Sequence, residues 1–405
     1  MHEFMRLNRN LKLRTLTTFL STILSASVMP NMTIYYSHYF GAFTTGILLI
    51  IVSILGFISG LYGGHLADVH GRKPIMLIGV ALMACGYGVA AAMNSLWLTN
   101  PYITFGAFLI ANIGGTFADP AEQAMMIDVS TPRNRQFVYA MIYWVMNIGV
   151  MLGAAIGGWF FRDYLFELLI VMAAVAVINF CIVHFGMAET LPAEHPTSGS
   201  VWGALRSYAS VLTDGRYVIF LLGYIASTIV TMQPSYYLAV HLGRDFITAH
   251  LFGMTIYGQR MLSLISITNT VMIVFMMSIF TQIGRKMHLT QEYGLGMSLQ
   301  AVAFAASFIV NSLIPMLVCA IVLTIGEMFT VPASQTLRAD MMNPARIGAY
   351  SGAISAVRPL SAIVAGSLVS ASGLLGNAGM AVIMLVLGVV SILLTNKSAG
   401  MEAGF

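Results

Sequence analysis

The sequence predicts an all-α integral membrane protein with twelve transmembrane helices in two pseudo-symmetric six-helix halves. Three observations support this fold class: the composition, the series of apolar segments and an internal repeat. Of the 405 residues, 58% are hydrophobic and 8% are charged, whereas a soluble domain carries roughly a quarter charged residues. The mean hydropathy is +0.84. Because a chain of this length cannot enclose so much apolar side chain in water, we expect lipid to be its solvent.

Apolar segments of about twenty residues, each separated by charges or turn residues, predict the individual helices. The first six predicted helices cover residues 14–36, 40–67, 74–94, 102–128, 137–160 and 164–187. The other six cover residues 216–242, 262–284, 291–312, 314–338, 347–371 and 374–395. We therefore expect an N-terminal bundle at 1–187, a linker at 188–215 and a C-terminal bundle at 216–405. The linker is rich in Pro, Ser and Gly, and its stretch Val201–Leu212 could form a short interfacial helix.

The distribution of basic residues predicts the orientation of the helices. Fifteen of the 19 lysines and arginines lie at one predicted end of the helices. Arg162, Arg244 and Arg260 lie near the other end, and Arg358 lies within a span. Because cytoplasmic loops are enriched in Lys and Arg, we expect both termini and the linker to face the cytoplasm of a bacterial plasma membrane.

The two halves share short matching segments. Residues 120–132, PAEQAMMIDVSTP, match residues 332–344, PASQTLRADMMNP, at five positions with an offset of 212. The tripeptide Gly71–Lys73 recurs as Gly284–Lys286 with an offset of 213. Two independent matches at nearly one offset indicate that the halves are structural repeats.

The loop GGHLADVHGRKP at Gly63–Pro74 resembles the signature that members of the major facilitator superfamily carry between their second and third helices. It matches at Gly64, Leu66, Ala67, Asp68, Gly71, Arg72 and Lys73, while Val69 replaces the usual basic residue. Parallel six-helix repeats are also the architecture of that superfamily. The resemblance implies a major facilitator fold and transport by alternating access.

Within the superfamily, the whole chain resembles the multidrug/proton antiporters of lactococci and other Gram-positive bacteria. The segments that carry the resemblance are Met32–Tyr36, Gly71–Pro74, Val240–Leu242, Tyr257–Leu262 and Met342–Pro344. It implies export of lipophilic, often cationic compounds in exchange for protons, with the proton-motive force in place of a cofactor. The glycines of Asn147–Gly158 resemble a motif of such exporters, although close helix packing requires the same small residues.

Asp68, Arg72 and Asp128 form the first candidate site. Asp68 lies at the end of the second predicted helix, and Asp128 at the same end of the fourth. We expect these acids to lie near one another and near Arg72. One hypothesis is a charge relay that holds one conformation and opens on protonation; the alternative is a static ion network that only fixes topology.

Glu327 is a carboxylate in the middle of the tenth predicted helix, with no basic residue within one turn. Because ionisable groups are costly in hydrocarbon, such a residue is a functional hypothesis, here proton binding or contact with a cation. The alternatives are an unseen arginine partner or a permanently held proton. The resemblance also suggests Arg260, which could instead be an interfacial anchor. Arg14 and Arg358 are weaker candidates for relay cations.

Asp119 and Glu122 distinguish this chain from the antiporters that it resembles. Those relatives carry acids in helices five and seven where this chain has Ile142 and Ser235. Asp119 and Glu122 could compensate, because residues three apart share a helix face. Asp128 lies nine residues beyond Asp119, about 180° around the helix. We expect the pair to bind protons or a cationic substrate, unless the helix ends early and water reaches it.

The leading functional hypothesis is proton-driven multidrug efflux by a monomer that contacts membrane lipids. The alternatives are a lipid or glycolipid flippase and a monovalent cation/proton antiporter, because fold alone does not select among them. Besides Glu327, Asp119 and Glu122, the candidate substrate-binding residues are Tyr143, Trp144, Asn147, Met232, Gln233, Tyr236 and Gln259.

The sequence argues against other classes of protein. Its loops hold no nucleophile–base set or metal-ligand cluster, so we expect neither an enzyme nor a metal site. The net charge of +4 is a topology signal and predicts no nucleic-acid partner. Cys85, Cys181 and Cys319 lie in different apolar segments, so we expect three buried free thiols.

Overall fold

The computed structural model describes residues 7–131, 134–191, 210–251, 253–343 and 347–401. Most of the expected interfacial helix at Val201–Leu212 lies outside these residues, as do Pro132 and Pro344 of the repeat. The chain divides into two compact units, Met1–Val28 with Ile51–Val201 and Met29–Ile50 with Trp202–Phe405. The expected halves at 1–187 and 216–405 stay a prediction.

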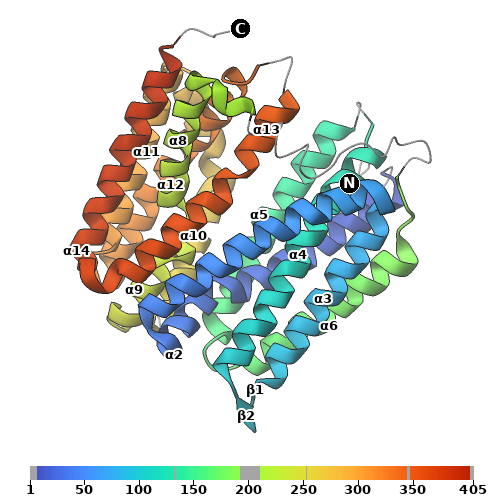
Figure 1. Cartoon of the computed structure of the whole chain (residues 1–405). Helices are drawn as coiled ribbons and strands as arrows, with labels where there is room; N and C mark the ends of the chain where they lie inside the picture. Colours follow the sequence, from blue (N-terminus) through green and yellow to red (C-terminus); the bar gives the residue numbers. More distant parts are fainter. Residues whose placement is uncertain (1–6, 132–133, 192–209, 252, 344–346, 402–405) are drawn as a thin grey trace. The chain divides into compact units, whose positions relative to one another are not determined.

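The first unit is built from helices and one short hairpin (Figure 1). Its elements are parts of α2 (Arg9–His70), α3 (Arg72–Ala92), β1 (Asn94–Ser95), β2 (Leu98–Thr99), α4 (Pro101–Val129), α5 (Arg135–Phe160), α6 (Leu165–Cys181) and the π-helical turn η1 (Ile182–Gly186). The two strands pair antiparallel, with Asn94 opposite Thr99. Helix α3 packs against both α4 and α6.

The second unit contains the middle of α2 and the C-terminal part of the chain. Its other elements are η2 (Ser210–Thr213), α8 (Gly215–Thr231), η3 (Gln233–Ser235), α9 (Tyr237–Asp245), β3 (Ala249–Leu251), β4 (Met254–Ile256), α10 (Gly258–Gly284), α11 (Leu289–Ser307), α12 (Leu313–Asp340), α13 (Ile347–Ser355) and α14 (Val357–Ala399). Helix α14 packs against α8 and α11, while α12 packs against α10 and α11. Buried side chains of these helices form one large apolar core.

Two long helices are each interrupted by a glycine with positive φ. Gly41 interrupts α2 (φ 76°), and Gly376 interrupts α14 (φ 63°). Glycine adopts this backbone region without the steric cost that other residues have. Each helix therefore consists of two segments, which in α2 agree with the predicted helices 14–36 and 40–67. The predicted helix 347–371 is instead divided between α13 and the first segment of α14, and the segment after Gly376 agrees with the predicted helix 374–395. The helix predicted at 216–242 is divided by η3 into α8 and α9, and the strands β3 and β4 that follow α9 pair antiparallel.

Polar residues cap several helices where the sequence changes from loop to apolar segment. Asn100 accepts hydrogen bonds from the backbone N–H groups of Tyr102 and Ile103, and Pro101 begins α4. Asp214 caps α8 by accepting from the N–H of Tyr217. Such caps satisfy N–H groups that lack a partner within the helix, which explains where these helices begin.

Eight helices of the described residues are long and apolar enough to cross a membrane. They are Arg9–His70, Arg72–Ala92, Pro101–Val129, Phe137–Phe160, Leu165–Gly186, Gly258–Gly284, Leu313–Asp340 and Gly352–Ala399.

The expectation that all three cysteines are buried needs correction. Cys319 is buried, but Cys85 and Cys181 are exposed, because they lie on outward sides of α3 and α6.

Candidate functional site

Arg72 connects two acids from different helices of the first unit. Its Nη1 donates to Oδ1 of Asp68 at 2.5 Å, and its Nε donates to Oδ2 of Asp128 at 3.3 Å. Nη1 also donates to the carbonyl of Ala67 at 2.8 Å. The Arg72 side chain is only 7% exposed, whereas that of Asp68 is 72% exposed. The expected proximity of Asp68 and Asp128 is therefore present, with Arg72 between them.

A sharp turn at Gly71 places Arg72 in the first turn of α3. Gly71 has φ 102° and separates the end of α2 from the start of α3. The Glu189 carboxylate accepts from the backbone N–H groups of Arg72 at 2.9 Å and Lys73 at 3.0 Å. A carboxylate at a helix N-terminus is also favoured by the helix dipole. Glu189 thus serves as a cap for α3 from a distant part of the chain.

Hydrogen bonding determines the ionisation of Glu189, which lies beyond the end of η1. Partial burial raises the pKa of this carboxyl, but backbone N–H groups of Leu191, Thr190, Arg72 and Lys73 lower it further. The resulting pKa lies below the ordinary value of glutamate. Glu189 is therefore an anion at neutral pH, which is the form that accepts these four hydrogen bonds.

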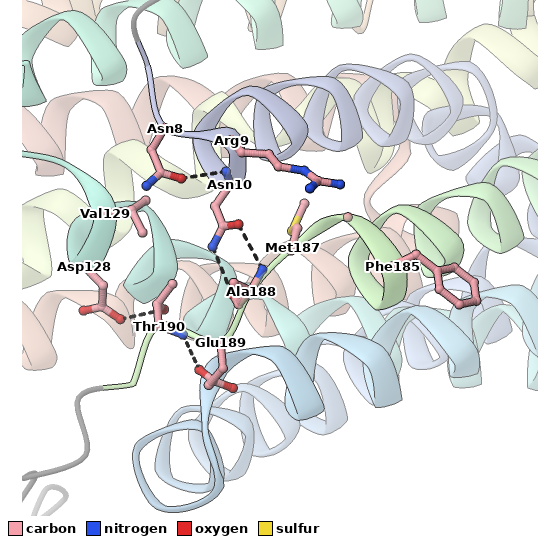
Figure 2. A pocket seen from close by; sticks show the side chains of 11 residues that line it. Asn8, Arg9, Asn10, Asp128, Val129, Phe185, Met187, Ala188, Glu189 and Thr190 are labelled. Atoms are coloured by element: carbon pink, nitrogen blue, oxygen red, sulfur yellow. Dashed lines mark hydrogen bonds between the residues drawn. The ribbon is translucent and has the colours of Figure 1, made fainter.

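The start of the predicted linker is attached to this network (Figure 2). Thr190 Oγ1 donates to Asp128 Oδ2 at 3.1 Å. Asn10 and Ala188 exchange two hydrogen bonds, at 2.9 and 3.0 Å. Lys73 Nζ donates to the carbonyls of His184 at 2.7 Å and Met187 at 2.9 Å. Sequence reasoning missed Glu189 and Thr190, because their segment has the composition of a polar linker. The one signal that could have found Glu189 is an acid directly after an apolar helix.

A cavity of about 500 Å³ lies beside these contacts in the first unit. Figure 2 shows that the side chains around it come from the start of α2, the end of α4, η1 and the segment after η1. Its lining residues are Asn8, Arg9, Asn10, Asp128, Val129, Phe185, Gly186, Met187, Ala188, Glu189 and Thr190. Asp128 is thus shared by the cavity and the Arg72 network.

A second ion pair joins α2 to α4. Arg14 Nη2 donates to Oε2 of Glu122, and the two side chains are 11% and 19% exposed. Arg14 Nη1 also donates to Thr17 Oγ1 at 3.2 Å. Both residues were separate candidates from the sequence, and the structure brings them together. The Nε of Arg14 is buried without a hydrogen-bond partner among the described residues, so Glu122 is its principal compensation.

Asp119 has different surroundings from Glu122, although the two lie one turn apart on α4. Asp119 is exposed, and its Oδ2 accepts from Gln123 Nε2 at 2.9 Å. Asp128 bonds to Arg72 and Thr190 instead. The three acids of α4 therefore have three separate sets of partners, as the helical spacing of Asp128 from Asp119 suggested.

Glu327 is the candidate carboxylate of the second unit. Its Oε2 accepts from Asn269 Nδ2 of α10 at 2.6 Å. Asn269 also donates to Thr324 Oγ1 at 3.3 Å. No cation pairs with Glu327 among the contacts described, which agrees with the absence of a basic neighbour in the sequence. Sequence reasoning missed Asn269, since a lone amide in an apolar helix carries no spacing signal.

The other basic candidates lie in the second unit. Arg260, in the first turn of α10, donates to the carbonyl of Thr255 at 2.5 Å and lies over the Tyr257 ring at 4.7 Å. This geometry fits an anchor of the β3–β4 hairpin. Arg358 is exposed near the start of α14.

The candidate substrate residues fall into two sets. In α5 of the first unit, Tyr143 and Trp144 are 55% and 53% exposed, and Asn147 donates to the carbonyl of Tyr143. In the second unit, Met232 and Gln259 are half-buried and Tyr236 is buried. Gln233 is fully buried and donates to the carbonyl of Ile229 at 2.8 Å. Gln233 thus helps to hold the break between α8 and α9.

The glycines of α5 pack directly against α2. A Cβ on Gly153 would lie 2.7 Å from the Cβ of Ala26, and one on Gly149 would lie 3.0 Å from the Cβ of Thr22. These distances leave no room for a larger residue without a shift. The packing explanation therefore accounts for these two glycines.

Long apolar helices with ionisable side chains between them define a multi-pass membrane transporter. The chain belongs to the Major Facilitator Superfamily, whose family model matches residues 15–366. It is accordingly a transporter and not an enzyme.

Two curated relatives carry transport names. The chain is 33% identical over 245 residues to a Na(+), Li(+), K(+)/H(+) antiporter of Planococcus maritimus. The aligned residues make up 58% of this chain and 58% of that protein. It is 24% identical to multidrug resistance protein MdtH of Photorhabdus laumondii, covering 80% of this chain and 77% of that protein.

Solved transporter structures share the fold. A peptide transporter POT in complex with sulfate superposes with a TM-score of 0.76 at 14% identity, covering 96% of this chain and 95% of that chain. A POT family transporter in complex with 5-aminolevulinic acid gives a TM-score of 0.72 at 16% identity, with the same coverage. At this identity the likeness concerns the fold alone.

Proposed function

We propose that this transporter is a proton-coupled antiporter that exports lipophilic, often cationic compounds. The single observation that carries the proposal is the Arg14–Glu122 ion pair between α2 and α4. Both side chains lie in helices long and apolar enough to span a membrane. Protonation of Glu122 removes its negative charge and leaves the Arg14 cation without its main partner. A proton can therefore change the interaction between two helices.

The energetics of such a pair suit a coupling device. Removing one partner of a buried ion pair costs about 3–5 kcal/mol, because the remaining charge is uncompensated. Moving one charge through the membrane potential is worth about 2.3 kcal/mol per 100 mV. The two energies are of similar size, so proton uptake and potential together can shift an equilibrium between conformations. Glu122 is the proposed coupling acid, and Arg14 is its proposed counter-ion.

Glu327 is the proposed cation-contacting or proton-binding group of the second unit. An amide donor satisfies one carboxylate oxygen but supplies no positive charge. The carboxyl can therefore bind either a proton or the positive charge of a substrate. We propose that this competition contributes to the exchange, whereas the sequence suggested proton binding or contact with a cation as alternative roles.

The Asp68–Arg72–Asp128 network is the proposed gate. Arg72 is buried against two acids, and Thr190 adds a contact from the segment after η1. Loss of either acid's charge would weaken the hold of α2 and α4 on the start of α3. A static network remains the alternative, and transport by a folded Asp68→Asn variant distinguishes the two.

A monovalent cation/proton antiporter is the second candidate. The observation that favours it is the printed name of the Planococcus relative, together with its 33% identity. Carboxylates such as Glu327 and the exposed Asp119 could contact a metal cation as well as an organic one. The MdtH relatives favour drug export instead.

Transport in inside-out membrane vesicles separates these functions. Dye accumulation and Na⁺- or K⁺-induced proton release are measured with the pH gradient and the membrane potential collapsed separately. Dye transport that stops with the pH gradient supports the drug antiporter, while proton release by Na⁺ or K⁺ alone supports the cation antiporter. Dye transport that is insensitive to both gradients overturns proton coupling, and lipid movement without dye movement indicates a flippase.

The remaining sequence expectations complete the proposal. We propose a monomer in a bacterial plasma membrane with both termini cytoplasmic, built from halves at 1–187 and 216–405. Similarity to the Gram-positive multidrug antiporters is part of the proposal, as are contacts with lipids. The proposed substrate contacts are Tyr143, Trp144, Asn147, Met232, Gln233, Tyr236 and Gln259, with Asp119, Arg260 and Arg358 as accessory charges.

A further inference from the structure

His241 is a fully buried histidine in α9 that has no part in the exchange proposed above. Its side chain is 0% exposed. The ring Nδ1 lies 3.1 Å from Oδ2 of Asp245, one turn along the same helix. The ring Nε2 lies 3.2 Å from the carbonyl oxygen of Val310, between α11 and α12. Both ring nitrogens therefore face oxygen atoms at hydrogen-bond distance.

Both facing groups can only accept hydrogen bonds. A carbonyl oxygen has no proton to donate, and an ionised carboxylate has none either. Arg244 donates to both oxygens of Asp245, at 2.7 Å each, which favours the ionised carboxylate. A neutral imidazole has one N–H, so in either tautomer the lone pair of its other nitrogen would point at an acceptor. Only the doubly protonated ring satisfies both contacts.

We infer that His241 is a proton-binding site, which as an imidazolium joins α9 to the segment between α11 and α12. The inference goes beyond the proposed function, because it concerns neither Glu122 nor Glu327. The imidazolium shares the Asp245 carboxylate with Arg244, but the Arg244 side chain is 51% exposed and is therefore also stabilised by its surroundings outside the pair, which leaves Asp245 as the counter-ion of the buried ring. Loss of the proton removes one hydrogen bond and replaces it with repulsion between lone pairs.

The surroundings of Asp245 extend the effect to α14. Asn377 Nδ2 donates to Asp245 Oδ2 at 3.2 Å, and Asn377 Oδ1 accepts from Tyr237 Oη at 2.7 Å. Asn377 directly follows Gly376, where α14 changes direction. A proton on His241 thus acts on a cluster that joins α9, the segment at Val310 and the break in α14.

Other ionisable groups on neighbouring elements do not replace Asp245. Arg260 of α10 is engaged with the Thr255 carbonyl and the Tyr257 ring. His38 lies in the segment of α2 that contacts Gly243 through Ile34, but a histidine is not a carboxylate and does not take the place of Asp245. Asp245 is therefore the carboxylate that faces the His241 ring, and it is the residue to change.

The experiment is nitrogen NMR of the full chain in lipid nanodiscs, with ¹⁵N-labelled histidine, at pH 7. The His241 signal is assigned by its loss in His241→Asn. We expect two protonated ring nitrogens for His241 in the wild type, and a neutral ring in Asp245→Asn. Glu167→Gln, which changes an exposed acid in the first unit, serves as the control and leaves the signal unchanged.

If His241→Asn does not fold, His241→Gln is used to assign the signal, so that the response to Asp245→Asn stays an independent test. A neutral His241 in the wild type overturns the inference. An imidazolium that persists unchanged in Asp245→Asn also overturns it, since the carboxylate would then not be its counter-ion.

Discussion

Arg14 of α2 and Glu122 of α4 form an ion pair although 108 positions separate them in the sequence. Each side chain is mostly shielded, and each lies in a helix that is long and apolar enough to cross a membrane. A pair of this kind is costly to bury and still more costly to break. This property makes it both a structural element and a possible place for a proton to act.

The substitution Glu122→Gln tests the structural role of the pair. It removes the charge that compensates Arg14, so we expect the free energy of unfolding to fall by about 3–5 kcal/mol. The matched control is Asp119→Asn, one turn away on the same helix and exposed, where we expect a change within about 0.5 kcal/mol. Thermal unfolding in detergent measures both. Equal effects of the two substitutions would contradict the description of Glu122 as the compensated buried acid.

The double substitution Arg14→Met with Glu122→Leu separates stability from transport. Replacing a buried ion pair with apolar residues is often neutral or stabilising. We therefore expect the double variant to recover the thermal stability lost in Glu122→Gln but to remain inactive in proton-driven dye transport. Recovery of transport together with stability would show that the pair is only structural.

Asp68→Asn should affect transport far more than stability. The Asp68 side chain is 72% exposed, and exposed ion pairs contribute about 0–1 kcal/mol. We expect a nearly unchanged melting temperature and at least a tenfold loss of proton-coupled transport, roughly 1.4 kcal/mol per decade in rate. Vesicle transport and thermal unfolding are measured on the same preparation. Wild-type transport in the folded variant would favour the static network.

Glu189 should make stability depend on pH in a defined direction. Its pKa is lowered in the folded state, because backbone N–H bonds outweigh the effect of partial burial. Its contribution is therefore complete above the ordinary glutamate pKa of about 4.3 and is lost as the pH falls through the lower folded value. We expect Glu189→Gln to melt below the wild type at pH 7, with a difference that shrinks below about pH 4. The control Glu167→Gln, at an exposed acid, should show no such trend. A difference that is constant over this range would contradict the assignment.

Gly71→Ala should disrupt the turn that positions Arg72. A side chain at φ 102° is strained, and its Cβ would lie 2.5 Å from Oε2 of Glu189. We expect a loss of about 1–3 kcal/mol from the backbone alone, because φ and ψ at this position lie in a region that only glycine adopts readily. Gly88→Ala is the matched control in α3, since a Cβ there meets no atom within 4 Å. Thermal unfolding that is equal for both would contradict the requirement for glycine at position 71.

Much of the fold follows from hydropathy alone, because lipid requires long apolar helices. The signature around Asp68 also led to Arg72, four residues away, and Asp128 could be expected nearby because it lies at the same predicted end of its helix. The Arg14–Glu122 and Asn269–Glu327 contacts could not be predicted, because a single sequence does not give the rotation or neighbours of separate helices. Glu189 was missed for a different reason. Its role depends on chain reversal after η1, whereas its composition suggested only a linker.

Proton-driven transport by Glu122 variants in proteoliposomes tests the central claim most directly. An imposed pH gradient is applied to the wild type, Glu167→Gln and Glu122→Gln, and dye transport is measured after each protein has been checked for folding. The account predicts gradient-driven transport in the wild type and in the control Glu167→Gln, at an exposed acid with no assigned role, and its loss in folded Glu122→Gln. Undiminished gradient-driven transport in Glu122→Gln would contradict it.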